Sequence, residues 1–395
     1  MADYLQGYFG VNQSTVEAVN DVTVAIRNWF INRNPLITRL AQRPVGNSVF
    51  TTYTHAYRKG SITLSATVTQ NSSLTISVDD GTFLMNHDLI ELVDPVNGTE
   101  VVQVTSDTTQ GGTPITGSGP YTVTVKRGVA GTSALSTIAN GTTGYVYSNS
   151  RTGAEINQAG LSTLGVPHTQ YTQTFQFPVQ VGGAAESNTA QVFPAGIQSP
   201  LEFNRTQQLQ NMVDSIENTI YYGRAEAPNS ADTTTAKADG IRNWLTTNKV
   251  TAPTNAAAYT AADLSRDLFQ GPLSNGGQPN LLVVSPDFQT AFQIWNSPLV
   301  RLSAGATEMG VAINLFHAPF LNDVAVIVAP LLRPKTAFAL TVEEVFYRPK
   351  RNPFWQPRGA LGDMYQGDWL HEGAIQIINE QHHAWVEGIT AFAAN

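Results

Sequence analysis

The sequence predicts an α+β protein made of several parts, in which β-rich and helical segments follow one another along the chain. Residues 51–180 hold short stretches of alternating apolar and polar residues, separated by turn clusters, as in a small antiparallel β module. A long helical pattern begins at residue 199, and residues 231–330 then alternate between strand and helix signals. Because strand signals return over residues 331–395, the chain is expected to hold more than one core.

Composition sets the first limits on function. With 395 residues, 42% of them hydrophobic, the chain can bury two or three cores. Only 13% of the residues are charged, about half the usual share, so Thr, Asn, Gln and Ser must supply much of the polar surface. A weakly charged surface suits a protein that packs against copies of itself, and it equally suits an ordinary soluble protein.

Several classes of site and partner are disfavoured by the same numbers. The chain has no cysteine, which excludes disulfides, thiol nucleophiles and Cys-ligated metals. Its net charge of −8, without a basic run, does not suit direct condensation of nucleic acid, so any enclosed DNA would need another agent to drive it in. No secretory signal and no apolar run of roughly 20 residues is found, which predicts a soluble protein made in the cytoplasm, without a membrane partner.

Residues 1–50 are predicted to form an N-terminal arm. Ser14 and Glu17 match a capping box, and a helix is predicted over residues 15–32, before Asn34-Pro35 ends it. The apolar stripe of this helix consists of Val19, Val22, Ile26, Trp29 and Phe30. Since no core sequence adjoins this helix, we expect it to pack on a neighbour, for which another subunit is one choice.

The β module is predicted to occupy residues 60–150. Its strands are expected in the stretches Ser61–Thr69, Ser73–Val78, Asp88–Val93, Val101–Thr105, Tyr121–Lys126 and Gly144–Tyr147. Extended patterning on either side, at Val49–Arg58 and Gln170–Gly183, predicts two long strands that pair and carry the module as a projecting flap. The alternative is two unrelated strands within one larger sheet.

A long helix is predicted over residues 200–222. Ser199 is its cap, Pro200 its first residue, and Glu202 completes the start signal, while Gly223 ends it. Apolar residues recur at spacings of three and four: Leu209, Met212, Val213, Ile216 and Ile220. At 1.5 Å per residue the helix spans roughly 35 Å. We expect one face to lie on a core that includes the C-terminal strands; a coiled coil is the weaker alternative.

Residues 231–330 predict an α/β unit. Thr260 caps a short helix, Asn280–Val284 forms a buried strand, and Ser285-Pro286 starts a helix that carries Phe288, Phe292 and Trp295. Further strands are expected at Val311–Phe316, Asp323–Val328, Ala337–Leu340, Glu343–Phe346 and within residues 367–392.

The sequence offers no candidate catalytic, cofactor or metal site, and the chain is not expected to be an enzyme. It has no Gly-rich phosphate loop, no Gly-x-Ser-x-Gly elbow and no His-Glu-x-x-His motif. His382 and His383 are adjacent, so in a strand they point to opposite faces and are expected to be surface or interface residues rather than joint metal ligands.

Residues 346–355 interleave aromatic and basic residues with prolines. A nucleic-acid patch is one interpretation, and an extended inter-subunit loop is the one we favour, because Arg and aromatic residues are enriched at protein contacts. The residues that carry this prediction are Arg348, Arg351, Phe354 and Trp355.

The order of these elements resembles the major capsid proteins of tailed bacteriophages, whose fold is of the Hong Kong 97 type. Within that fold the chain is similar to a family with a β insertion at the extended loop. The matching segments are Asn34-Pro35-Leu36, a strand ending in Arg127-Gly128 before Gly131-Thr132, Gly362-Asp363, Glu372, and Asn379-Glu380 followed by Ala384 and Gly388. The arm lacks the family's usual Phe, and His382-His383 lengthens the spacing before Ala384.

The resemblance implies a domain plan: an arm over residues 1–50, an extended loop with insertion over 51–180, a peripheral domain with its spine helix over 181–230, an axial domain over 231–330, and a return to the peripheral domain over 331–395. It implies hexamers and pentamers that build an icosahedral head around double-stranded DNA, which is held without sequence-specific contact. The implied partners are copies of the chain, a scaffolding protein, a portal, and a decoration or cement protein, and the implied location is the virion.

Inter-subunit contacts are predicted at Trp29, Phe30, Arg58 and Arg127, together with the four residues of the 346–355 segment named above. The rival prediction is a β-rich carbohydrate-binding or adhesion protein of the virion surface, with its site in residues 60–150. A hydrolase ranks third, since no nucleophile is recognisable. Deleting the module separates the first two, because an adhesin would still fold and a capsid subunit would fail to close shells.

Overall fold

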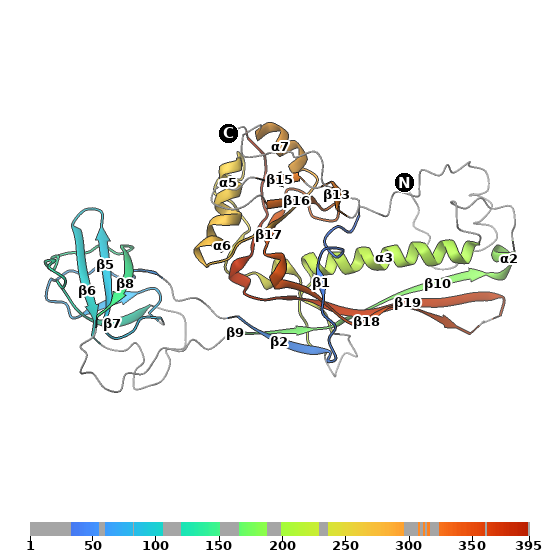
Figure 1. Ribbon diagram of the computed structural model, residues 1–395, viewed down its shortest axis with the longest axis horizontal. Helices are drawn as coiled ribbons and strands as arrows, with labels where there is room; N and C mark the ends of the chain where they lie inside the picture. Colours follow the sequence, from blue (N-terminus) through green and yellow to red (C-terminus); the bar gives the residue numbers. More distant parts are fainter. Residues whose placement is uncertain are drawn as a thin grey trace. The chain divides into compact units, whose positions relative to one another are not determined.

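The computed structural model describes most of the chain, and every structural statement below concerns these residues only. They are 33–54, 60–81, 83–105, 120–150, 166–187, 199–228, 236–295, 307–308, 311–312, 314–316, 324–359 and 362–393. The predicted arm helix over 15–32, with Trp29 and Phe30, and also Arg58, lie outside them. The chain divides into a main unit, Met1–Thr54 with Val166–Asn395, and an inserted unit, His55–Gly165 (Figure 1).

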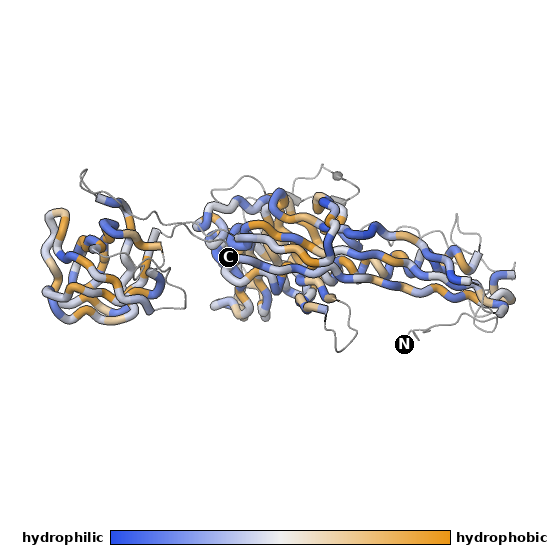
Figure 2. The backbone as a smooth tube through the Cα atoms, turned by 90° about the horizontal axis from the view of Figure 1, so that it is seen from below, coloured by the Kyte–Doolittle hydropathy of each residue, from blue (hydrophilic) through white to orange (hydrophobic). Residues whose placement is uncertain are grey.

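The inserted unit is one six-stranded antiparallel sheet with strand order β3-β8-β5-β6-β7-β4. Its strands are β3 (Ser61–Thr63), β4 (Thr75–Val78), β5 (Asp88–Asp94), β6 (Gly98–Val104), β7 (Tyr121–Lys126) and β8 (Thr143–Asn149). Each of the six predicted stretches contains or overlaps one of them. Alternate residues such as Ile90 and Leu92 belong to a separate core. Figure 2 shows hydrophobic and hydrophilic stretches interspersed along the backbone of this unit.

Asp94 closes the β5–β6 hairpin and ties it to a distant segment. Its carboxylate accepts the backbone N–H groups of Val96 (2.8 Å), Asn97 (3.0 Å) and Ala139 (2.8 Å). These hydrogen bonds favour the charged form, and they lower the pKa of Asp94 from 3.8 to about 2.

The inserted unit is therefore expected to lose stability in acid. Because the pKa of Asp94 is lower in the folded state, its contribution is fully present above pH 3.8 and disappears as the pH falls through about 2. All six tryptophans lie outside residues 55–165, so far-UV circular dichroism reports both units and tryptophan fluorescence reports the main unit. Asp94→Asn is expected to weaken the inserted unit at neutral pH and to flatten its response between pH 4 and 2. An unchanged acid profile would contradict this role.

The main unit holds a four-stranded sheet with order β1-β18-β19-β10. Its strands are β1 (Ala41–Gln42), β10 (Gln173–Gly182), β18 (Val345–Arg358) and β19 (Met364–Ile377). Helix α3 (Pro200–Tyr222) lies along β10 and β19 (Figure 1). The Ser199 hydroxyl accepts the Glu202 N–H at 3.2 Å, and Gly223 ends the helix, so both predicted boundaries are confirmed.

Helix α3 buries one stripe of its surface against this sheet, as predicted. Met212, Ile216 and Ile220 are almost completely buried in a core shared with the sheet. At the N-terminal half of the helix, the indole N–H of Trp369 on β19 donates to the Arg205 carbonyl at 2.9 Å. The C-terminal strands are therefore a packing partner of the helix, and β10 is a second one that the sequence did not predict.

Two strand predictions need correction. Residues 346–355 do not form a loop: they belong to β18, whose pairing with β19 is interrupted by irregularities between Pro349 and Phe354 that hide the alternation. Gln170–Gly183 is not one strand either. Only Gln170 and Tyr171 pair with β2 (Val49–Thr54), as part of β9 (Val166–Tyr171), whereas β10 pairs with β19. β10 thus belongs to the four-stranded sheet, in agreement with the alternative prediction that the two strands are unrelated and one lies in a larger sheet.

A second, mixed sheet lies at the other end of the main unit, in the order β11-β20-β17-β12-β16-β15. Its strands are β11 (Lys249–Val250), β12 (Leu281–Val284), β15 (Asn314–Phe316), β16 (Val324–Val328), β17 (Ala337–Leu340) and β20 (Ala384–Val386). Leu281 and Val283 face the core beneath α3, while Leu282 and Val284 face another core. The predicted buried strand is thus confirmed, and this sheet separates two cores.

Short helices enclose the second core of the main unit: α5 (Ala261–Ser265), η3 (Arg266–Gln270), α6 (Gly271–Ser274) and α7 (Phe288–Trp295). Thr260 and Asp263 form the predicted capping box of α5. On α7, Phe288 and Trp295 pack edge-on against Phe392 near the C-terminus, at ring-centroid distances of 5.0 and 5.8 Å. The strand predicted at Glu343–Phe346 is only partly correct, because residues Val342–Glu344 form a 3-10 turn and β18 begins at Val345.

Candidate functional site

Strands β2 and β9 form a two-stranded antiparallel ribbon in the main unit, hereafter the ribbon. Its cross-strand pairs run from Val49 with Tyr171 at one end to Thr54 with Val166 at the other. Alternation places six uncharged residues on one side: Val49, Thr51, Tyr53, Pro167, Thr169 and Tyr171. We call this side the open face. Tyr53 is 58% exposed and Val49 is 44% exposed.

The opposite side of the ribbon rests on the main unit. The Gln376 amide of β19 donates to the Thr52 hydroxyl at 2.8 Å. The His168 ring stacks on Trp244 of α4 (Ile241–Trp244), with ring centroids 4.0 Å apart. The ribbon is therefore held on one side and exposed on the other.

Four predicted contact residues lie on β18, and the structure does not bring them into one patch. Arg348 donates to Gln376 at 2.8 Å and lies over the Phe50 ring, so it supports the ribbon from within the unit. Arg351 is about half exposed and donates to Glu372 at 3.0 Å.

Further along β18, Trp355 packs against Trp369 at 5.6 Å, beneath the Arg205 guanidinium at 4.6 Å. Phe354, 39% exposed, presents a free apolar surface. Inter-subunit contact at these positions stays a prediction, for which Phe354 and Arg351 have the accessible surface.

The prediction that Arg127 contacts a neighbouring subunit needs correction, because Arg127 is an internal residue of the inserted unit. Its side chain is 3% exposed and forms a buried ion pair with Glu100, to which its Nε donates at 2.9 Å. Two more of its N–H groups donate to the carbonyls of Gln70 (2.5 Å) and Leu135 (2.8 Å). With its donors used in this way, Arg127 holds its own unit together and has no side-chain surface for a neighbour.

His382 and His383 are also buried rather than exposed, which corrects the prediction for these two residues. Burial lowers the pKa of His383 and of His371 to about 4, so both are neutral at physiological pH. The His382 ring nitrogen lies 2.8 Å from the Glu344 carboxylate. His371 hydrogen-bonds the Tyr347 hydroxyl at 2.5 Å. These side chains fill and join the cores of the main unit.

Metal binding and membrane insertion find little support in the described part of the chain. No three His, Asp or Glu side chains there gather as a metal ion would require. No helix in that part is long and apolar enough to cross a membrane.

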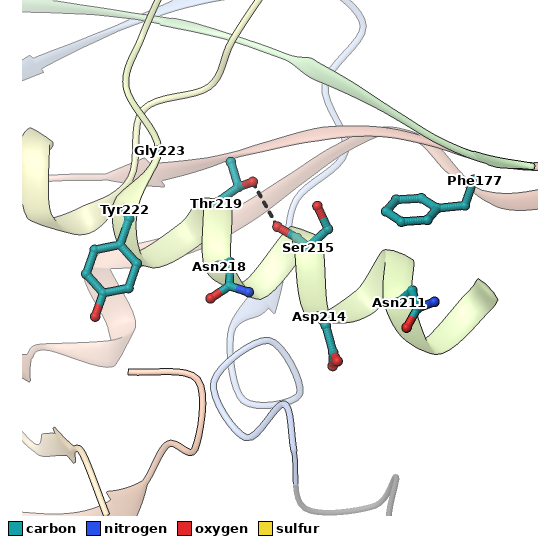
Figure 3. A pocket seen from close by; sticks show the side chains of 8 residues that line it. All are labelled: Phe177, Asn211, Asp214, Ser215, Asn218, Thr219, Tyr222 and Gly223. Carbon is teal, nitrogen blue, oxygen red and sulfur yellow. Dashed lines mark hydrogen bonds between the residues drawn. The ribbon is translucent and has the colours of Figure 1, made fainter. Parts of the chain in front are cut away.

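A groove of about 510 Å³ runs along α3 (Figure 3). Its lining is Phe177, Asn211, Asp214, Ser215, Asn218, Thr219, Tyr222 and Gly223. The one carboxylate in this lining, that of Asp214, already binds the Arg33 guanidinium at 3.0 Å and the Asn34 amide at 2.9 Å. The groove therefore presents amides and hydroxyls, with no nucleophile–base pair among its residues.

The open face escaped the sequence analysis, although a signal for it was present. The stretch VFTTYT of β2 alternates, yet alternation alone does not say which of the two sides becomes buried. Gln170 and the residues it contacts were missed for a different reason: its partners are 69 and 205 residues away in sequence.

Comparison with known protein families gives the class of this chain, a structural protein of a phage capsid. The chain belongs to the SU10 major capsid protein family, whose model matches residues 6–390. It is a phage major capsid protein, a structural subunit of the virion shell with an α+β fold, and not an enzyme. The family assignment decides between capsid and adhesion function in favour of the capsid.

Solved structures similar to this chain include proteins from two mycobacteriophages and an encapsulin. Mycobacterium phage Bobi gives 8% identity and a TM-score of 0.44, over 95% of this chain and 97% of that chain. Mycobacterium phage Adephagia gives 8% and 0.43, over 96% and 97%. The SrpI encapsulin complex from Synechococcus elongatus gives 13% and 0.42, over 57% and 78%. No curated protein sequence matches the chain.

Proposed function

We propose that copies of this chain form hexamers and pentamers of an icosahedral head, and that the open face of the ribbon lies on a neighbouring copy. The observation that carries this proposal is the uncharged character of all six residues on that face, two of which are large and exposed, Val49 and Tyr53. A two-stranded pair is marginally stable in water by itself. A neighbour that covers the open face would remove this apolar surface from water and stabilise the ribbon.

The size of this contact fits closed assembly. Burying one such side chain contributes about 1.5–3 kcal/mol. Interfaces in a closed symmetric shell repeat around every subunit, so that modest contacts add up. A chain without cysteine has no disulfide to reinforce them, and non-covalent overlap is the mechanism that remains for its own side chains.

The remaining parts of the chain are assigned by resemblance to the family. Residues 231–330 act as the axial domain near the capsomer centre, and residues 1–50 act as an arm that reaches a neighbour. The region around α3 and its sheet acts as the peripheral domain. In support of this plan, the ribbon and the inserted unit follow one another in the chain, as an extended loop with an insertion requires.

Partners other than copies of this chain are also proposed from the resemblance to the family. They are a scaffolding protein and a portal during assembly, a decoration or cement protein, and packaged double-stranded DNA. The net charge of −8 argues against strong DNA binding by the shell and suits contact without sequence preference. Synthesis in the bacterial cytoplasm would precede incorporation into the virion.

Tyr53→Ser tests the role of the open face. The loss of a tyrosine contact worth about 1.4 kcal/mol or more is expected to raise the protein concentration needed for shell formation about tenfold. Sedimentation and electron microscopy of the purified protein measure the fraction in closed particles. The matched control is Tyr365→Ser, which removes a tyrosine that is 51% exposed at the far end of β19. Shells formed by Tyr53→Ser at the wild-type threshold would refute the proposal.

A further inference from the structure

Gln170, on strand β9 of the ribbon, is completely buried and uses its whole side-chain amide in hydrogen bonds. Its Nε2 donates to the carbonyls of Asp239 and Ile375, each at 3.0 Å. Its Oε1 accepts the N–H groups of Asp239 at 2.8 Å and Tyr171 at 3.1 Å. A carboxamide has two donors and two acceptor sites, so no capacity is left over.

The partners of this amide belong to different elements of the main unit. Ile375 lies on β19, and Asp239 lies in the segment that leads into α4. His168, two residues before Gln170 and on the same side of β9, lies 3.2 Å from the Asp239 carboxylate and stacks on Trp244. Asp239 is thus contacted twice from one strand: its backbone forms hydrogen bonds with Gln170, and its carboxylate lies beside the His168 ring.

We infer that Gln170 is a positioning residue that fixes the direction of the ribbon against the rest of the main unit. The inference rests on the proposed role of the open face, because that direction decides where a neighbouring copy is met. Hydrogen bonds to one planar amide are directional. If the ribbon swung away, the N–H and C=O of Asp239 and the C=O of Ile375 would lose their partner while buried, and such groups are expensive to leave unpaired.

Few side chains other than that of glutamine can form these hydrogen bonds at position 170. Leucine at position 170 would fill the space but leave the three backbone groups unpaired. Glutamate would place a carboxylate oxygen against two carbonyl oxygens, which repel it. Asparagine keeps the amide but is one methylene shorter, so it cannot reach both Asp239 and Ile375 with the same geometry.

Because the chain has no cysteine, the direction of the ribbon can be measured directly. Thr51→Cys on the ribbon and Gln207→Cys on α3 introduce two exposed labelling sites into the full-length chain. Spin labels at these sites give a distance distribution for the unassembled subunit. We expect a narrow distribution, which Gln170→Leu broadens, because each unpaired group lowers the population of the fixed direction about tenfold. An equally narrow distribution in Gln170→Leu overturns the inference.

The matched control is Gln176→Leu, the same change at an exposed position of β10, which is expected to leave the distribution narrow. If Gln170→Leu loses its far-UV circular dichroism spectrum, Gln170→Asn takes its place with the same two outcomes. It retains a carboxamide and perturbs the fold less.

Particle assembly separates this inference from the proposed function. Gln170→Leu is expected to give particles of heterogeneous diameter, whereas Tyr53→Ser lowers particle yield and leaves the label distances unchanged. Normal assembly by Tyr53→Ser contradicts the proposed function alone. Unchanged label distances in Gln170→Leu contradict the inference alone.

Discussion

Replacing Arg127 by methionine is expected to destabilise the inserted unit by about 3–5 kcal/mol, the usual cost of removing one partner from a buried ion pair. Glu100, fully buried, would keep a carboxylate that now faces only the N–H groups of Gly128 and Leu135. The Gln70 and Leu135 carbonyls would each lose a charged donor. Since a domain is stable by only about 5–15 kcal/mol, the loss is a large share of the total.

Two optical signals distinguish the units in this experiment. In urea, tryptophan fluorescence follows the main unit alone, because residues 55–165 contain no tryptophan, while far-UV circular dichroism follows both. We expect Arg127→Met to shift the dichroism transition and leave the fluorescence transition in place. Lys126→Met, one residue earlier and exposed, is the control and should stay within about 0.5 kcal/mol of the wild type. A variant Arg127→Met that unfolds at the wild-type urea concentration would show that the ion pair adds no stability.

Replacing Gly388 by alanine is expected to cost the main unit about 2–5 kcal/mol. The backbone at Gly388 has φ of +84°, where a side chain costs about 1–2 kcal/mol. A Cβ atom there would also lie 2.2 Å from the Thr251 carbonyl oxygen, and relieving such overpacking costs about 1–3 kcal/mol more. The effect is expected in the tryptophan fluorescence transition, since β20 with Trp385 directly precedes this turn.

Gly46→Ala is the matched control for this glycine. A Cβ at Gly46 meets no atom within 4 Å, so the substitution is expected to be neutral or to stabilise slightly, by about 0.4–1 kcal/mol. Equal urea midpoints for Gly388→Ala and Gly46→Ala would mean that the backbone near Thr251 moves away from the new Cβ atom without loss of stability.

Gly388 also explains the C-terminal motif that resembles the capsid family. Asn379 adopts the left-handed conformation with φ of +52°, and the Glu380 carboxylate accepts the Thr246 and Thr247 N–H groups at 3.0 and 3.4 Å. In this motif Asn379 forms a turn, Glu380 binds the backbone of Thr246 and Thr247, and Gly388 allows the chain to pass close to Thr251. These are requirements of folding, which is why the motif could identify the family without pointing to a reactive site.

The arm segment Asn34-Pro35-Leu36 has a similar explanation. Glu217 on α3, fully buried, accepts the N–H groups of Leu36 at 3.2 Å and Ile37 at 3.3 Å, and the Tyr221 hydroxyl at 2.5 Å. Burial raises the pKa of Glu217 to about 7. Leu36 and Ile37 are thus bound to the C-terminal third of the long helix by a carboxyl group that no sequence motif singles out.

Elements whose causes are local could be predicted from the sequence. A cap, a proline and a glycine set the ends of α3, and alternation set the strands of the inserted unit. A short continuous apolar run set the buried strand β12. These signals act over distances of a few residues, where backbone hydrogen bonding and side-chain periodicity decide the conformation.

Which of these elements pack against one another became known from the three-dimensional structure. It paired β10 with β19, turned a predicted loop into β18, and buried the histidines and Arg127 that had been expected at the surface. It also left one side of the ribbon open and brought Gln170 to partners far away in sequence. The physical reason is that burial and long-range pairing depend on which surfaces compete for the same core, and no pattern within a short segment records that competition.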